Sequence, residues 1–126
     1  MSVDWRIIRN AETDEIVLER AKWCASFWCH FRGLQLVSNL PQNQGLLFVT
    51  GSESRSGSAI HMFFMLMEIA VVWLDSSGKV VDKKLAKPWR PIYSPAQPAQ
   101  YYIEANTDLL ERVQIGDVLR FDETTA

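Results

Sequence analysis

The sequence predicts a mainly β (α+β) domain, in which a compact barrel-like or sandwich-like sheet carries one short packed helix and a second helical turn near the C-terminus. Short runs of strand-forming residues recur along the chain, and turn residues separate them every ~8–12 positions. Only one stretch has apolar residues at helical spacing. The 126 residues have the size of one typical domain, so we expect a single domain over residues 1–126.

The strands are expected from alternation and from β-branched or aromatic runs. Residues 16–24 alternate most cleanly, with Ile16 and Leu18 on one face and Val17 and Glu19 on the other. The Ser/Gly-rich stretch at residues 51–58 is typical of a surface loop. The other short strands are expected at residues 3–9, 46–50, 101–104 and 118–121.

A hairpin is the strongest local signal. Residues 69–74 are apolar and rich in β-branched side chains, and residues 79–85 follow after the turn Asp75-Ser76-Ser77-Gly78. Residues 69–74 end a longer run, residues 60–74, that is apolar except for His61 and Glu68. We expect this run to form the centre of the core. Four prolines at residues 88, 91, 95 and 98 then impose an extended path outside the sheet.

The spacing changes after Ser26. Phe27, Phe31 and Leu34 recur at intervals of four and three, which predicts a short amphipathic helix. Ser26 is a good N-cap, and Gly33 stands where a left-handed residue ends a helix. A helix of two turns has little stability of its own, so we expect it to dock its apolar face on the sheet.

The charge balance excludes two classes of partner. Thirteen basic and fifteen acidic residues give a net charge of −2, without the basic surface that nucleic acids or anionic membranes require. The longest apolar run has fifteen residues, fewer than the ~20 needed to span a bilayer, and no secretory signal is visible. We expect no nucleic-acid partner, no membrane association and a cytoplasmic location.

The two cysteines, Cys24 and Cys29, are separated by four residues. This spacing does not match a zinc knuckle, and only His30 and His61 are available to complete a site. In a cytoplasmic protein we expect both to be reduced thiols. The sequence therefore predicts neither a metal site nor a cofactor.

Several short motifs follow one another in a fixed order. They are Phe31-Arg32-Gly33-Leu34, Gly45-Leu46-Leu47-Phe48, Ile60-His61-Met62-Phe63-Phe64-Met65, Val71-Val72-Trp73-Leu74-Asp75 with Gly78-Lys79-Val80-Val81, and a tail of Tyr102-Ile103-Glu104-Ala105 and Ile115-Gly116-Asp117-Val118-Leu119. Their order and spacing, from about Ile16 to Phe121, resemble the DUF192 family of uncharacterised bacterial and archaeal proteins. The resemblance implies a small β-rich fold and no established activity.

One position departs from the family pattern. Members commonly carry Pro, a branched apolar residue and Asp after the His/aromatic/Met stretch, where this chain has Glu68, Ile69 and Ala70. This protein has either lost the carboxylate or moved it to Glu68. Residues 68 and 70 would share one face if both belonged to a strand.

Five residues form the candidate pocket: His61, Met65, Glu68, Arg32 and Arg55. His61 and Glu68 are polar groups in an apolar run, and together they suit either general acid–base chemistry or ligand orientation. The alternative is structural, with both side chains bonded to backbone groups at a bend. Arg32 and Arg55 suit an anion, although the favoured role for Arg32 is to donate hydrogen bonds to carbonyls at the helix end or in a neighbouring loop.

The function that fits these observations best is a non-enzymatic domain that binds a small ligand or a protein. The alternative is a small hydrolase-like enzyme that uses His61 and Glu68. The geometry of these two residues distinguishes the hypotheses, because an enzyme needs them to converge in a pocket that solvent reaches.

Overall fold

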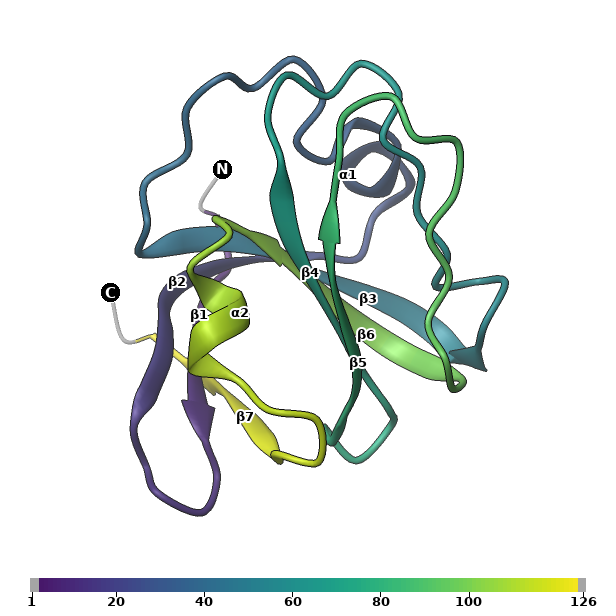
Figure 1. The fold of residues 1–126 in the computed structure, drawn as a ribbon. Helices are drawn as coiled ribbons and strands as arrows, with labels where there is room; N and C mark the ends of the chain where they lie inside the picture. The colour runs from purple at the N-terminus through teal and green to yellow at the C-terminus, as the bar shows by residue number, and fades with distance from the viewer. Residues whose placement is uncertain (1–2, 125–126) are drawn as a thin grey trace.

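The computed structural model describes residues 3–124, and seven strands in this part of the chain form one curled, half-barrel sheet (Figure 1). Its strand order is β5-β4-β6-β3-β2-β1-β7. The strands are β1 (Trp5–Asn10), β2 (Ile16–Cys24), β3 (Gln44–Ser54), β4 (Ile69–Leu74), β5 (Val80–Ala86), β6 (Ala99–Ala105) and β7 (Leu119–Glu123). Two short helices, α1 (Phe27–Arg32) and α2 (Leu109–Arg112), complete it. The predicted fold class is confirmed.

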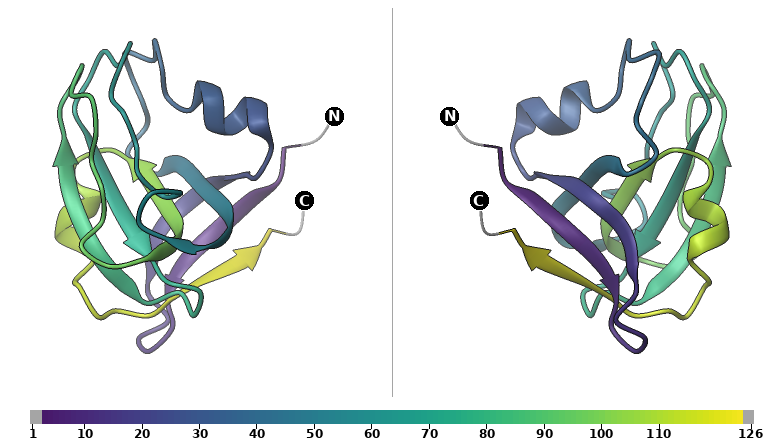
Figure 2. Two further views of the ribbon diagram at one scale, coloured as in Figure 1. Left: turned by 90° about the vertical axis from the view of Figure 1, so that its right-hand side faces the viewer. Right: turned by 90° about the vertical axis from the view of Figure 1, so that its left-hand side faces the viewer.

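All neighbouring strands are antiparallel except β2 and β3, which are parallel. A parallel pair needs a crossover connection, and here the crossover contains α1. Figure 2 shows α1 at one end of the molecule and the β1–β2 turn at the opposite end. Cys24 and Leu34, the buried residues that flank α1, pack in a cluster on one face of the sheet, which we call the α1 side.

Both faces of the sheet are packed, and β4 is buried along its whole length. Val72 and its alternate neighbours pack with Leu109 of α2 in one cluster of buried side chains. Trp73 and its alternate neighbours pack with Phe48 and Tyr102 in a second cluster on the α1 side. A strand covered on both faces is apolar without alternation, which explains the continuous apolar run at residues 69–74.

The apolar run is only partly a strand. β4 begins at Ile69, and residues 60–68 form a connecting segment whose backbone bonds to another connection instead of to the sheet. Ile60 exchanges N–H···O bonds of 2.9 and 2.8 Å with Tyr93, and the Met62 amide donates to the Arg90 carbonyl at 2.9 Å. Glu68 lies immediately before β4 and is exposed, whereas Ala70 within the strand is buried.

Strand β3 is longer than expected. It extends to Ser54, which pairs with Ala99 of β6, so only the end of the Ser/Gly-rich stretch is a loop. Pairing with β6 supplies hydrogen bonds that the local composition does not indicate. Tertiary pairing has overridden a loop-forming sequence here.

Helix α1 has its expected ends but not its expected packing. Ser26 accepts a hydrogen bond from the Cys29 amide at 3.2 Å, and Gly33 ends the helix at φ +48°. No α1 residue is buried, and Phe27, Trp28 and Phe31 are 73%, 73% and 60% exposed. These three rings contact one another at centroid distances of 5.6–6.1 Å, so the expectation of an apolar face docked on the sheet is wrong.

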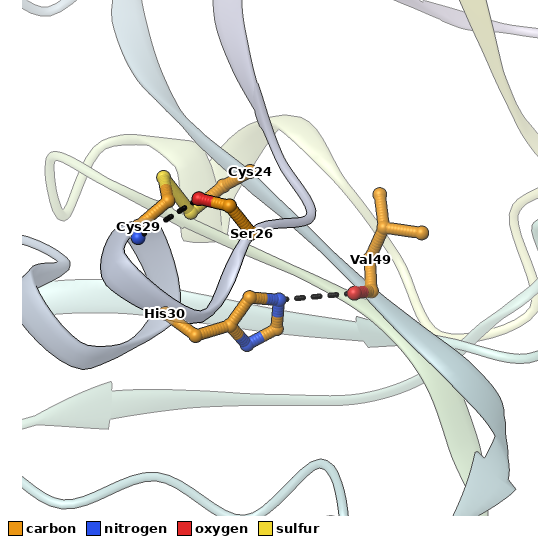
Figure 3. The surroundings of a disulfide bond; sticks show 5 residues. All are labelled: Cys24, Ser26, Cys29, His30 and Val49. Carbon is orange, nitrogen blue, oxygen red and sulfur yellow. Dashed lines mark hydrogen bonds between the residues drawn. A yellow bond between two sulfur atoms is a disulfide. The ribbon is translucent and has the colours of Figure 1, made fainter.

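A disulfide between Cys24 and Cys29 holds the helix instead (Figure 3). The expectation of two reduced thiols is wrong. Ser26 caps the helix immediately after β2, and the first helical turn brings Cys29 back beside the end of the strand, with Cα atoms 5.5 Å apart. That separation is normal for a disulfide.

We predict that Val72→Asp unfolds the domain, because Val72 is fully buried and an unpaired buried charge costs several kcal/mol against a total stability of about 5–15 kcal/mol. Thermal unfolding measures the effect. Leu85→Asp on β5 is the matched control, since Leu85 is 40% exposed and should tolerate the charge. Equal melting temperatures for wild type and Val72→Asp would contradict the assignment of β4 to the core.

Candidate functional site

A pocket of about 90 Å³ lies on the α1 side of the sheet. Its walls come from α1 and the residues after it, from residues 59–61 and Met65, and from strands β3 and β6. The strands contribute Phe48, Tyr102 and Glu104. We call this the Glu104 pocket, because its most unusual member is the buried carboxyl group of Glu104.

Glu104 reaches the pocket through the alternation of β6. Tyr102 belongs to the buried cluster on the α1 side, and Ile103 and Ala105 belong to the cluster on the α2 side. Glu104, two residues after Tyr102, projects toward the α1 side, and it pairs in register with Leu46 of β3 and Val71 of β4. The acidic side chain therefore rises from the interior of the sheet.

The Glu104 carboxyl group is buried without a protein partner. The residue is 7% exposed, and within residues 3–124 no protein group forms a hydrogen bond or an ion pair with its carboxyl oxygens. Every fully enclosed polar side-chain atom in this part of the chain has a hydrogen-bond partner, so the carboxyl oxygens of Glu104 must retain contact with open space. The pocket that Glu104 lines supplies that space.

Burial raises the pKa of Glu104 from 4.5 to about 8. Desolvation is the cause of this shift, and no neighbouring cation opposes it. Burial, together with the charge of Glu104, also raises the pKa of the Tyr102 hydroxyl. Glu104 is consequently protonated in most molecules at pH 7, and its carboxyl group then both donates and accepts hydrogen bonds.

Aromatic rings form the pocket wall beside Glu104. Phe48 stacks on Tyr102 with centroids 4.6 Å apart, and the His30 ring meets Phe48 edge-on at 5.2 Å. Nε2 of His30 lies 2.9 Å from the Val49 carbonyl oxygen, which ties α1 to β3 (Figure 3). The disulfide and this hydrogen bond therefore hold α1 in place over the strands.

Gly33, at the end of α1, lines the pocket beside Phe48 and Glu104. A Cβ atom at this position would lie 3.5 Å from Phe48 and 3.7 Å from Oε1 of Glu104. The positive φ that ends α1 also favours glycine here. The helix end and the carboxyl group are thus in close proximity.

The structure brings three of the five predicted site residues to the Glu104 pocket: Arg32, His61 and Met65. Met65 is buried, whereas Arg32 and His61 are exposed. Nδ1 of His61 accepts a hydrogen bond from the Phe63 amide at 3.2 Å, the structural role that the sequence left open. Among the described residues, Arg32 makes no recorded hydrogen bond to the carbonyls at the helix end.

Two predicted residues lie outside the pocket. Glu68 is exposed in the segment before β4 and does not line the pocket. Arg55 donates from Nε to the Pro95 carbonyl at 2.9 Å, a contact that ties two connecting segments together. The pocket therefore contains His61 without Glu68, and its carboxyl group comes from Glu104.

The sequence did not lead us to predict Glu104 as a site residue, although Glu104 belongs to the tail motif Tyr102-Ile103-Glu104-Ala105. A signal was present: Glu104 follows Ile103 and precedes Ala105 in a short strand of otherwise apolar or aromatic residues. A charged residue at a sheet position that must be buried is seldom stable unless it is paired or functional. Glu104 lines the pocket and Glu68 does not.

A metal does not fit this arrangement. Within residues 3–124, no group of three or more His, Cys, Asp or Glu side chains is placed to hold an ion. The sulfur atoms of Cys24 and Cys29 are bonded to each other in the disulfide.

In the part of the chain that the structure describes, no helix is long and apolar enough to cross a bilayer.

Comparison with known proteins places the chain among uncharacterised proteins. Residues 7–121 match the DUF192 family, described as an uncharacterised ACR family. A UPF0127 protein of Thermococcus kodakarensis, TK1120, is 45% identical over 83% of this chain and 66% of its own length. A second, from Thermococcus gammatolerans, is 46% identical over 79% of this chain and 64% of its own length. The chain thus spans just under two thirds of these relatives.

Two solved structures share the fold. A putative transcription regulator of Sinorhizobium meliloti superposes with a TM-score of 0.80 over 96% of both chains, at 18% identity. A protein of unknown function from Novosphingobium aromaticivorans gives a TM-score of 0.77 over 94% of this chain and 84% of its own, at 14% identity. At such low identities these likenesses show the fold alone.

We predict that Glu104 makes the domain less stable as the pH rises. Between pH 4.5 and about 8 the folded state holds a proton that the unfolded state has released, so stability falls with pH, by at most about 1.4 kcal/mol per unit. Glu104→Gln should remove this slope and be the more stable protein at pH 9. Chemical denaturation across this pH range measures it.

The matched control is Glu68→Gln, which removes an exposed carboxylate and should reproduce the wild-type profile. Parallel stability profiles for wild type and Glu104→Gln would show that the Glu104 carboxyl group is solvated like an ordinary surface group.

Proposed function

This chain belongs to the DUF192 family of uncharacterised proteins, and from the chemistry of its own pocket we propose that the domain binds a small polar ligand at Glu104 without catalysing a reaction. The observation that carries the proposal is the buried, unpartnered Glu104 carboxyl group facing the pocket.

A buried polar group without a partner is expensive. Leaving it unsatisfied costs about 1–3 kcal/mol, and native proteins pair nearly all such groups with protein or water. A protein retains such a group when an occupant of the site supplies the missing hydrogen bonds. Among the described residues no side-chain polar atom is both fully enclosed and unpaired, so the Glu104 carboxyl oxygens open on the pocket, which has room for several water molecules or for a group of a few heavy atoms.

Binding is favoured over catalysis by the arrangement of the candidate residues. The hydrolase-like alternative needs His61 and Glu68 together in one pocket, and Glu68 lies outside it. His61 already accepts a hydrogen bond from a backbone amide. The pocket therefore offers groups that orient a ligand and lacks the acid–base pair on which that alternative rests.

We also propose that the domain has no nucleic-acid or membrane partner. The net charge of −2 gives no basis for nucleic-acid or membrane binding. Binding to a protein remains the second form of the binding hypothesis, and the exposed cluster of Phe27, Trp28 and Phe31 is the surface that favours it. Such apolar patches commonly mark interaction sites.

A cytoplasmic location likewise stays a proposal. The Cys24–Cys29 disulfide is typical of oxidising compartments, although intracellular proteins of hyperthermophiles are also rich in disulfides. Fractionation of cells that express the protein, with thiols alkylated at lysis, tests it. Recovery in the periplasmic or secreted fraction would contradict it.

We expect small polar fragments, screened by amide chemical shifts on labelled protein, to shift Gly33, Phe48 and Tyr102. Glu104→Leu should abolish these shifts, because it replaces the polar group with a side chain of similar size, whereas Glu68→Gln should preserve them. A dispersed amide spectrum confirms that Glu104→Leu is folded. Fragments that map only to Phe27, Trp28 and Phe31, or that persist in Glu104→Leu, would overturn the proposal.

A further inference from the structure

We propose that the ligand of the Glu104 pocket carries a small protonated amino group, whose ammonium head binds beside the Glu104 carboxylate. This inference rests on the proposed function, since it names the chemical class of the ligand. It follows from the charges, the walls and the size of the pocket.

The Glu104 carboxyl group can become negatively charged, and no cation of the described residues is paired with it. The titratable groups that line it are His30 and Arg32 from α1, His61 from the adjoining segment, and Tyr102 and Glu104 from β6. None of these forms an ion pair with Glu104: the Arg32 side chain lines the pocket, but it is exposed and makes no salt bridge to the carboxyl group. A ligand that brings its own positive charge would supply the missing partner.

The walls are suited to a cation. Phe48, Tyr102 and His30 form a contiguous aromatic cluster next to the carboxyl group. Aromatic rings attract ammonium groups through their quadrupole, and the attraction is stronger where water is excluded. Once Glu104 is ionised, an anion in the pocket would be repelled by the carboxylate.

The donor set does not suit a divalent metal, and the size of the pocket limits the size of an organic cation. A pocket of about 90 Å³ accommodates an ammonium group with one or two carbons. A divalent metal requires several oxygen or nitrogen ligands, and within residues 3–124 no cluster of such side chains is present. An ammonium group needs only the carboxylate and nearby acceptors for its three N–H donors.

The test is a titration with methylammonium chloride, followed through the amide shifts of Gly33, Phe48 and Tyr102. Because the cation requires ionised Glu104, whose pKa is about 8, the apparent affinity should rise about tenfold between pH 6 and pH 7. Glu104→Gln should lose at least about tenfold in affinity and the pH dependence with it. It retains both histidines, so a slope caused by them would persist.

Four controls separate the alternatives. Glu68→Gln should bind as wild type does, and sodium chloride at equal concentration should leave the pocket amides unmoved. Acetamide and sodium acetate are the neutral and anionic probes of similar size. Tighter binding of either one would overturn the ammonium inference and leave the proposed function standing. An unchanged affinity in Glu104→Gln, or no binding of methylammonium at all, would also overturn the inference, and failure of the fragment screen as well would overturn both.

Discussion

The structure depends on the burial of both faces of the central strands. β4 and β6 lie inside the sheet, and their side chains alternate between a core closed by α2 and a core on the α1 side. Consecutive apolar residues in β4 meet this requirement fully. A charged residue in either strand therefore points into one of the two cores. The free-energy cost of burying it depends on whether the layer over that core encloses its polar atoms.

On the α1 side the cover is built from connecting segments and one short helix. The segments are joined by backbone hydrogen bonds between residues 60–62 and 90–93. The helix is attached by the Cys24–Cys29 disulfide and by His30, while its large aromatic side chains point to solvent. A layer of this kind leaves the carboxyl group of Glu104 facing a small pocket. The pocket is thus a consequence of how α1 is held.

Local signals in the sequence predicted the strands, the β4–β5 hairpin and both ends of α1, because alternation, turn residues and caps act over a few positions. They did not predict where the long apolar run changes from a connection to a strand. Ile60 and Met62 bond to residues about thirty positions away, and no local pattern encodes that pairing. The extension of β3 to Ser54 was missed for the same reason, since its partner strand is distant in sequence.

The candidate site was predicted in part, for a related reason. Arg32, His61 and Met65 lie in motifs that converge, and they reach one pocket. The prediction for Glu68 depended on a strand that contains both Glu68 and Ala70. β4 begins at Ile69 and does not include Glu68. Glu104 was missed because its burial depends on β3, β4 and the α1 layer together. The disulfide was not predicted, because the expected cytoplasmic location, and not the geometry of the two cysteines, was the basis for predicting reduced thiols.

The most direct measurement of the central claim is a pH titration of the Glu104 side-chain carboxyl carbon by NMR in the free protein. The account predicts a midpoint near pH 8, well above the ordinary 4.5, because the group is buried without a counter-charge. The signal of Glu68, which is exposed, provides an internal comparison. A midpoint for Glu104 close to that of Glu68 would contradict the account, because it would mean that water solvates the Glu104 carboxylate as fully as it solvates a surface carboxylate.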